Sequence, residues 1–135
     1  MPYIKPPIFV RRVFNPIAIR FGIGGTEALM VPGRRSGTPR RTAIIPVEHQ
    51  GARYLVSPRG ETEWVRNLRA AQGLGELQSR NGLPQTFRAL ELPVAERPAV
   101  IAAYQAVAGR AVASFFVRLP DPADHPVFRL DPRSR

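Results

Sequence analysis

The sequence predicts a small α+β domain built on an antiparallel β-barrel with flanking helices. Its 135 residues, 44% of them hydrophobic, are enough for one domain with a real core. Short apolar segments are separated by turn residues, which is typical of hairpins. The strand–helix–strand alternation of a doubly wound sheet is missing. Together these observations favour a small barrel of antiparallel strands over a parallel sheet.

The N-terminal segment, residues 1–21, is basic and amphipathic. Apolar residues recur at helix-like spacing between Ile8 and Phe21, with arginines at positions 11, 12 and 20 between them. The pattern predicts either a helix that packs its apolar stripe on the domain, which we favour, or a helix that lies on an anionic membrane surface. Gly22–Thr26 is predicted to be a joint that leads into the barrel domain, residues 22–135.

Three strands are predicted next, at Ala28–Val31, at Thr42–Glu48 and at Arg53–Val56. Pro46 lies near the end of the second strand. The tetrapeptide H-Q-G-A at residues 49–52 predicts a hairpin turn between the second and third strands.

A helix is predicted at Glu61–Ala71, with Thr62 as its N-cap and Gly73 as its end. Its acidic residues, at positions 61 and 63, lie near the N-terminus. Its basic residues, at 66 and 69, lie toward the C-terminus, which suits the helix dipole. We interpret Arg69 as an exposed partner of that dipole.

The C-terminal half predicts a second hairpin, a helix and two further strands. Asn81-Gly82 is a strong hairpin signal between strands at Leu74–Ser79 and Leu83–Glu91. An alanine-rich helix follows at Ala95–Ala108, where Pro98 is tolerated in the first turn. The last two strands are predicted at positions 115–119 and 127–130.

The composition restricts the function classes. The net charge of +10 indicates an anionic partner: a nucleic acid, an anionic lipid or a polyanionic cofactor. The absence of cysteine excludes a disulfide, a thiolate metal site and a cysteine nucleophile, and suits a cytoplasmic location. His49 and His125 lack metal-ligand spacing, so we expect surface or structural histidines and no metal site. No apolar run is long enough for a membrane span.

The most informative segment is Gly33–Arg41, which reads G-R-R-S-G-T-P-R-R. Its glycines allow a tight turn, and its arginines can grip phosphate or carboxylate oxygens in a bidentate way. The segment therefore predicts an anion-binding loop, with a solvated basic hairpin loop as the alternative. A nucleic-acid-binding module is less favoured, because the loop lacks interleaved aromatic residues.

Three ordered motifs carry a family resemblance: G-R-R-S-G-T-P-R-R-T, then G-A-R-Y-L-V-S-P-R-G, then E-W-V-R-N-L-R-A. In this order they resemble the deazaflavin-dependent nitroreductase family of actinobacteria, over roughly Phe14 to Pro132. The resemblance implies a split β-barrel similar to the flavin-binding domains of pyridoxamine phosphate oxidases. It also implies coenzyme F-420, an 8-hydroxy-5-deazaflavin with a phosphate and an acidic oligoglutamate tail, with flavin mononucleotide (FMN) as the runner-up.

The resemblance further implies three groups of cofactor-binding residues. The phosphate and tail side is implied to be lined by Arg34, Arg35, Ser36, Arg40, Arg41 and Thr42. The turn that approaches the ring through backbone groups is Val56, Ser57, Pro58 and Arg59. The helix start that closes over the cofactor is Glu63, Trp64, Val65, Arg66 and Asn67. Trp64 can equally be an anchor of the core.

The implied activity is hydride transfer from the reduced deazaflavin to a flat, electron-poor acceptor: a quinone, an enone or a nitro compound. The tyrosine-rich substrate wall of the nitroimidazole-activating relative is not reproduced. Phe115, Phe116 and Phe128, with Tyr104, instead predict an apolar wall or core filling. No catalytic residue is assigned. The alternative is a non-catalytic FMN, deazaflavin or haem-type carrier. We expect a monomer or weak homodimer in the cytoplasm, with peripheral membrane contact through the N-terminus as a hypothesis.

Overall fold

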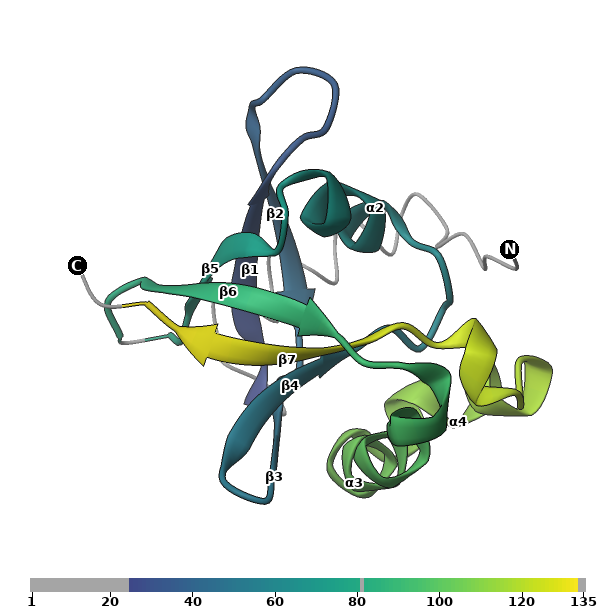
Figure 1. The fold of residues 1–135 in the computed structure, drawn as a ribbon. Helices are drawn as coiled ribbons and strands as arrows, with labels where there is room; N and C mark the ends of the chain where they lie inside the picture. Colours follow the sequence, from purple (N-terminus) through teal and green to yellow (C-terminus); the bar gives the residue numbers. More distant parts are fainter. Residues whose placement is uncertain (1–24, 81, 134–135) are drawn as a thin grey trace.

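The computed structural model describes residues 25–80 and 82–133, so the predictions for residues 1–21 lie outside the described part. Its centre is a curled sheet of seven antiparallel strands in the order β2-β1-β5-β6-β7-β4-β3 (Figure 1). This sheet confirms the predicted α+β antiparallel barrel. The strands are β1 Glu27–Pro32, β2 Pro39–Ile44, β3 Val47–His49, β4 Ala52–Val56, β5 Leu74–Gln78, β6 Gln85–Glu91 and β7 Val127–Pro132.

The predicted strand Thr42–Glu48 is in fact two strands, β2 and β3. Pro46 has no N–H for a sheet ladder, and the chain leaves the sheet at Ile45-Pro46. β2 pairs with β1 at one end of the sheet, whereas β3 pairs with β4 at the other. Since only two residues join these strands, the two ends of the sheet must lie close together, and the sheet curls into a barrel.

The predicted hairpin turn at residues 49–52 is confirmed. His49 pairs with Ala52, and the two residues between them have positive φ angles: 50° at Gln50 and 83° at Gly51. Two left-handed residues in a two-residue loop match the right-handed twist of the flanking strands.

Within the described residues, three α-helices flank the sheet: α2 Glu63–Ala70, α3 Arg97–Ala108 and α4 Arg110–Arg118. The predicted strand at residues 115–119 is wrong, because this segment belongs to α4. Gly109, with a φ of 58°, interrupts the helical path, and Val112, Phe115 and Phe116 then recur at helical spacing. Phe115 and Phe116 alone resembled a strand, because Val112, the apolar residue that shares their helix face, lies one turn earlier.

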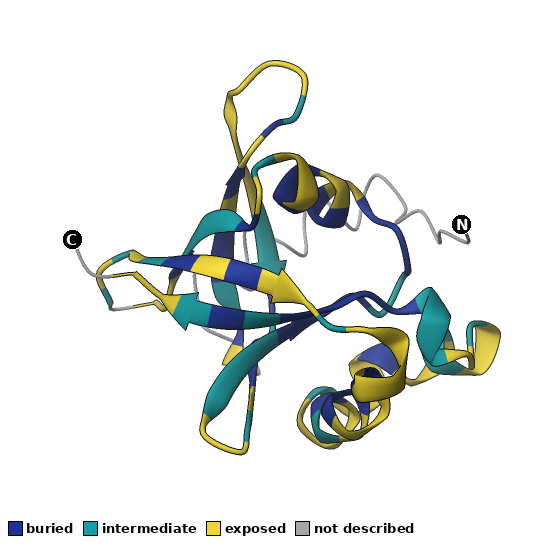
Figure 2. Cartoon of the chain, viewed as in Figure 1, coloured by how far each residue is buried: buried dark blue, intermediate teal, exposed yellow. Residues whose placement is uncertain are grey.

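The core has two parts, visible as buried surfaces of the sheet and helices in Figure 2. One part lies between the sheet and α2, and includes Leu29, Leu55 and Leu68. The other lies under α3 and α4, and includes Val56, Val100 and Tyr104 among others. Among the described residues, no helix is long and apolar enough to cross a membrane.

Candidate functional site

The loop between β1 and β2 is held in shape by its own backbone. The Gly33 N–H donates to the Thr38 carbonyl at 2.8 Å, and the Gly37 N–H donates to the Gly33 carbonyl at 2.8 Å. The Ser36 hydroxyl accepts from the Thr38 N–H at 3.1 Å. Gly37 has a φ of 75°, a conformation that favours glycine. These hydrogen bonds define the backbone shape of the basic loop.

Arg34 ties this loop to α2. Its backbone N–H and its Nη1 donate to Oδ1 of Asn67 at 3.1 and 2.8 Å, and Nη1 also donates to Oε1 of Glu63 at 2.9 Å. The Arg34 hydrogen bond is the main cause that holds the pKa of Glu63 below its usual range, and the charges of Arg66 and Arg35 lower it further. Arg34, Arg35 and Arg66 thus gather around the start of α2.

The structure separates Arg41 from Arg40, the other basic residue of β2. Arg40 and Thr42 lie opposite Val31 and Leu29, both buried in the core, so they are on the inner face of the sheet. Arg41 lies opposite Met30, which is 37% exposed, and is therefore on the outer face.

Arg35 and Arg40 are exposed, and neither forms an ion pair within residues 25–80 and 82–133. Figure 2 shows the loop that precedes β2 as largely exposed surface. Their guanidinium groups are available to an anionic ligand, whereas that of Arg34 already has two partners.

The turn between β4 and α2 is buried and internally bonded. The Ser57 hydroxyl donates to the Gly60 carbonyl at 2.6 Å and lies 3.4 Å from Thr62 Oγ1. Thr62 is the N-cap of α2, as predicted, but its side chain makes no cap hydrogen bond. The Thr62 side chain therefore does not occupy the first N–H groups of α2, the kind of donors that bind an anion or a carbonyl oxygen. Val56, Ser57 and Val65 are fully buried and are not open to a ligand, whereas Pro58 and Arg59 are half-buried.

The aromatic residues do not form one wall. Trp64 is 8% exposed and packs against Phe128, with ring centroids 5.9 Å apart, so both rings belong to the core below α2. Phe116 lies 6.2 Å from Tyr104 in the other part of the core. Burial raises the pKa of Tyr104, and the positive charge of Arg59 opposes that effect. Of the residues predicted to shape an acceptor pocket, Phe128 is core filling.

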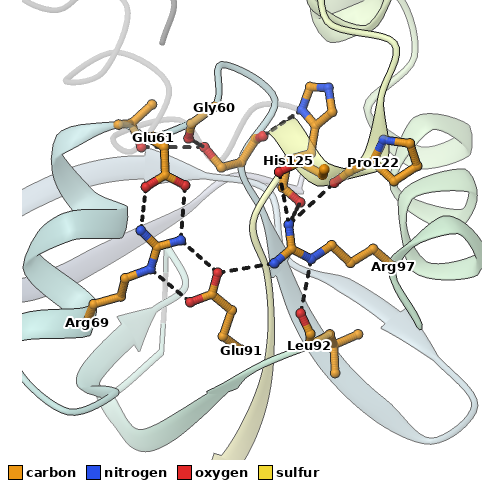
Figure 3. Close-up of polar contacts among 11 residues, drawn as sticks. Gly60, Glu61, Arg69, Glu91, Leu92, Arg97, Pro122 and His125 are labelled. Atoms are coloured by element: carbon orange, nitrogen blue, oxygen red, sulfur yellow. Dashed lines mark hydrogen bonds and ion pairs between the residues drawn. The ribbon is translucent and has the colours of Figure 1, made fainter. Parts of the chain in front are cut away.

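Two guanidinium groups and two carboxylates form a chain beside the turn (Figure 3). Arg69, on α2, contacts both carboxylate oxygens of Glu61 and donates to those of Glu91 at 2.8 and 2.7 Å. Arg97 donates from Nη2 to Glu91 at 3.3 Å. Arg69 is thus a doubly paired residue, whereas the sequence suggested an exposed dipole partner.

The chain of contacts closes through His125. Arg97 donates from Nη1 to the His125 carbonyl at 3.3 Å, and Nδ1 of His125 lies 2.9 Å from the Ser57 carbonyl. The Ser57 hydroxyl donates to the carbonyl of Gly60, the residue before Glu61, so the backbone closes the set. We call this set the polar ring: Ser57, Glu61, Arg69, Glu91, Arg97 and His125. Only Ser57 of these was among the predicted site residues, because the other contacts join segments that no local motif connects.

Glu61 makes the polar ring sensitive to acid. Its side chain is 8% exposed, and the hydrogen bond from Arg69 holds its pKa below the ordinary 4.5. A carboxylate with a lowered folded pKa stabilises the fold above its unfolded pKa, and that contribution is lost as pH falls through the folded value. We expect Glu61→Gln to cost about 1–2 kcal/mol at neutral pH, discounted for the partly exposed arginine.

The measurement is urea unfolding of the wild type and Glu61→Gln at neutral pH and at about pH 3, where the difference should shrink towards zero. Glu96→Gln is the matched control, because Glu96 is exposed and outside the polar ring. A difference that stays the same at both pH values would contradict the pairing.

The family model described as F420H2-dependent quinone reductase matches residues 9–83. One similar solved structure, described as a domain-swapped dimer, has 21% identity and a TM-score of 0.60, covering 89% of this chain and 92% of its own. An F420-H2 dependent reductase has 23% identity and a TM-score of 0.57, covering 78% of this chain and 93% of its own.

A pyridoxamine 5'-phosphate oxidase-like protein from Listeria innocua has 12% identity and a TM-score of 0.56, covering 88% of this chain and 91% of its own. No curated protein matches the chain. The structural likenesses confirm the split-barrel fold.

Proposed function

Because this chain belongs to the F420H2-dependent quinone reductase family, we propose that it transfers a hydride from reduced coenzyme F-420 to a flat, electron-poor acceptor, a quinone first of all. Family membership makes the protein an oxidoreductase of the deazaflavin-dependent type. The acceptor class and the roles of individual residues are the proposal.

One observation supports it above the others: the basic loop, whose Arg35 and Arg40 form no ion pair within residues 25–80 and 82–133, is tied through Arg34 to the start of α2. The phosphate and acidic tail of the coenzyme need several cationic donors, which Arg35, Arg40 and Arg66 supply. Thr42 shares the inner face of the sheet with Arg40 and adds a neutral donor. These residues fit a ligand with an extended negative charge.

When bound, the deazaflavin supplies the hydride. The chain's own residues bind and orient. In the proposal, the backbone of the half-buried Pro58 and Arg59 faces the ring, and Ser57 anchors this turn from inside the core. The N–H groups at the start of α2 face the oxygen atoms of the ring or the phosphate. Arg34 does not bind the coenzyme directly but holds the loop against Glu63 and Asn67.

The acceptor side is proposed to be apolar. Phe115 and Phe116 on α4 are half-buried, and Phe116 packs on His125 with ring centroids 4.3 Å apart. This flat aromatic surface lies near the turn after β4 that is proposed to contact the coenzyme ring, which we call the ring-contact turn. Such a surface suits a quinone or an enone better than a strongly polar acceptor.

The test is a fluorescence titration with coenzyme F-420 and with FMN, repeated at several protein concentrations. We expect tighter binding of F-420, because its longer acidic tail reaches more arginines. The affinity should not depend on protein concentration, because all the proposed contacts come from one chain, as expected of a monomer or weak homodimer. The reduced coenzyme should then be oxidised on addition of a naphthoquinone.

Three outcomes would overturn parts of this proposal. Equal or tighter binding of FMN would contradict the cofactor. Affinity that rises with protein concentration would indicate a site shared between two chains. Tight binding of F-420 without oxidation by a quinone, an enone or a nitro compound would indicate a carrier.

A further inference from the structure

We propose that His125 is a positioning residue: it fixes the buried Ser57, and through it the half-buried Pro58 and Arg59 that follow, which are proposed to face the coenzyme ring. This inference rests on the proposed function, because it assigns a task to the turn that the coenzyme is proposed to contact. His125 lies 68 residues from Ser57 along the chain and is 1% exposed.

Ser57 is held from both sides by the segment that contains His125. The Ser57 N–H donates to the Pro126 carbonyl at 3.0 Å, and its carbonyl lies 2.9 Å from Nδ1 of His125. A carbonyl oxygen only accepts, so the second contact requires the proton on Nδ1. With its hydroxyl bonded to Gly60 as well, each polar group of Ser57 has a partner.

The other ring nitrogen, Nε2, faces the carbonyl of Leu119, just after the end of α4. His125 therefore joins the ring-contact turn to the helix whose Phe116 lies on its imidazole.

His125 is itself held by Arg97. Arg97 is 7% exposed, and its Nη1 donates to the carbonyls of Pro122, Ala123 and His125 at 3.4, 3.4 and 3.3 Å. The Glu91 carboxylate accepts a hydrogen bond from this guanidinium and another from Arg69 (Figure 3). The polar ring thus supports the turn from β6, α2, α3 and the segment before β7.

The contact between His125 and Ser57 matters because it sets the position of the turn relative to the coenzyme ring. A displacement of about 1 Å in the groups that orient a reactive ring can cost on the order of a hundredfold in rate. Loss of the Ser57 contact should therefore lower the rate of hydride transfer per bound coenzyme more than it lowers the fraction of folded protein.

Two matched variants separate positioning from packing. The amide nitrogen of asparagine can take the place of Nδ1, so His125→Asn can keep the contact to Ser57 and lose the one to Leu119. The longer glutamine in His125→Gln can take the place of Nε2, so it keeps the contact to Leu119 and loses the one to Ser57. Both variants remove the same imidazole from the core.

The experiment uses the full chain with coenzyme F-420 and a naphthoquinone, and records kcat per bound coenzyme, KM, the absorption spectrum of the bound deazaflavin and the thermal midpoint. We expect His125→Gln to lower kcat about tenfold and to shift the spectrum, with His125→Asn within about threefold of the wild type. Equal kcat in the two variants, whether reduced or unchanged, would overturn the proposal.

A variant outside the core tests the proposal even if the His125 variants fail to fold. Glu91→Gln keeps a hydrogen-bonding oxygen but removes the charge that anchors Arg97, and should lower kcat by about threefold with the same spectral shift. Glu96→Gln is its control. An unchanged kcat and spectrum in Glu91→Gln would contradict the role of the polar ring. Absence of coenzyme binding in the wild type would instead count against the proposed function.

Discussion

Replacing Arg35 and Arg40 together by glutamine should weaken binding of coenzyme F-420 by about 2–4 kcal/mol, or roughly 30- to 1,000-fold. Both side chains are exposed, and neither has an ion pair among the described residues. Each would thus lose a charge-assisted hydrogen bond to the ligand without leaving a protein partner behind. Exposure keeps the expected loss at the low end of the range for such bonds.

The matched control is the pair Arg41→Gln and Arg133→Gln, which removes the same charge. Arg41 is on the outer face of β2, and Arg133 follows the end of β7, so neither lies with Arg40 on the inner face. Titration of each double variant with coenzyme F-420 at two salt concentrations separates long-range attraction by the net charge, which salt screens, from direct contacts with the coenzyme. An equal loss of affinity in both double variants would show that net charge alone attracts the coenzyme.

The second large effect concerns stability. Trp64→Ala should lower the free energy of unfolding by about 3–5 kcal/mol, because it removes a large ring from the core and leaves a cavity beside Phe128. Trp64→Phe keeps an aromatic ring in the same place and should cost about 1–2 kcal/mol. Urea unfolding measures both.

The same pair of variants decides between the two interpretations of Trp64. If Trp64 is a core anchor, folded Trp64→Phe should bind coenzyme F-420 within about threefold of the wild type. A large loss of affinity with little loss of stability would instead place the indole on the coenzyme.

Local signals explain why much of the fold could be predicted from the sequence. Asn81-Gly82 and the turn at 49–52 each specify a hairpin within a few residues, and the strands beside them are found in the structure. Helix α4 was missed because the aromatic pair Phe115-Phe116 suits a strand and a helix equally. Only the packing of this segment on α3 decides between the two structures.

The site was predictable only where its residues are contiguous. The basic loop is one stretch of sequence, but the polar ring joins Arg97 to His125 across 28 residues and His125 to Ser57 across 68. The opposite faces of Arg40 and Arg41 follow from strand alternation. That inference required β2 to begin at Pro39, whereas the sequence placed the strand start at Thr42.

The position of β2 at the end of the sheet has a consequence for the behaviour of the protein in concentrated solution. An end strand presents backbone groups to which a strand of another copy can add, the usual first step of aggregation. Two features of β2 oppose this addition. Pro39 has no N–H to pair with another strand, and the charges of Arg40 and Arg41 repel the same arginines of a second copy. Changes that tune the affinity for an anionic ligand at Arg40 therefore alter the colloidal stability of the protein at the same time.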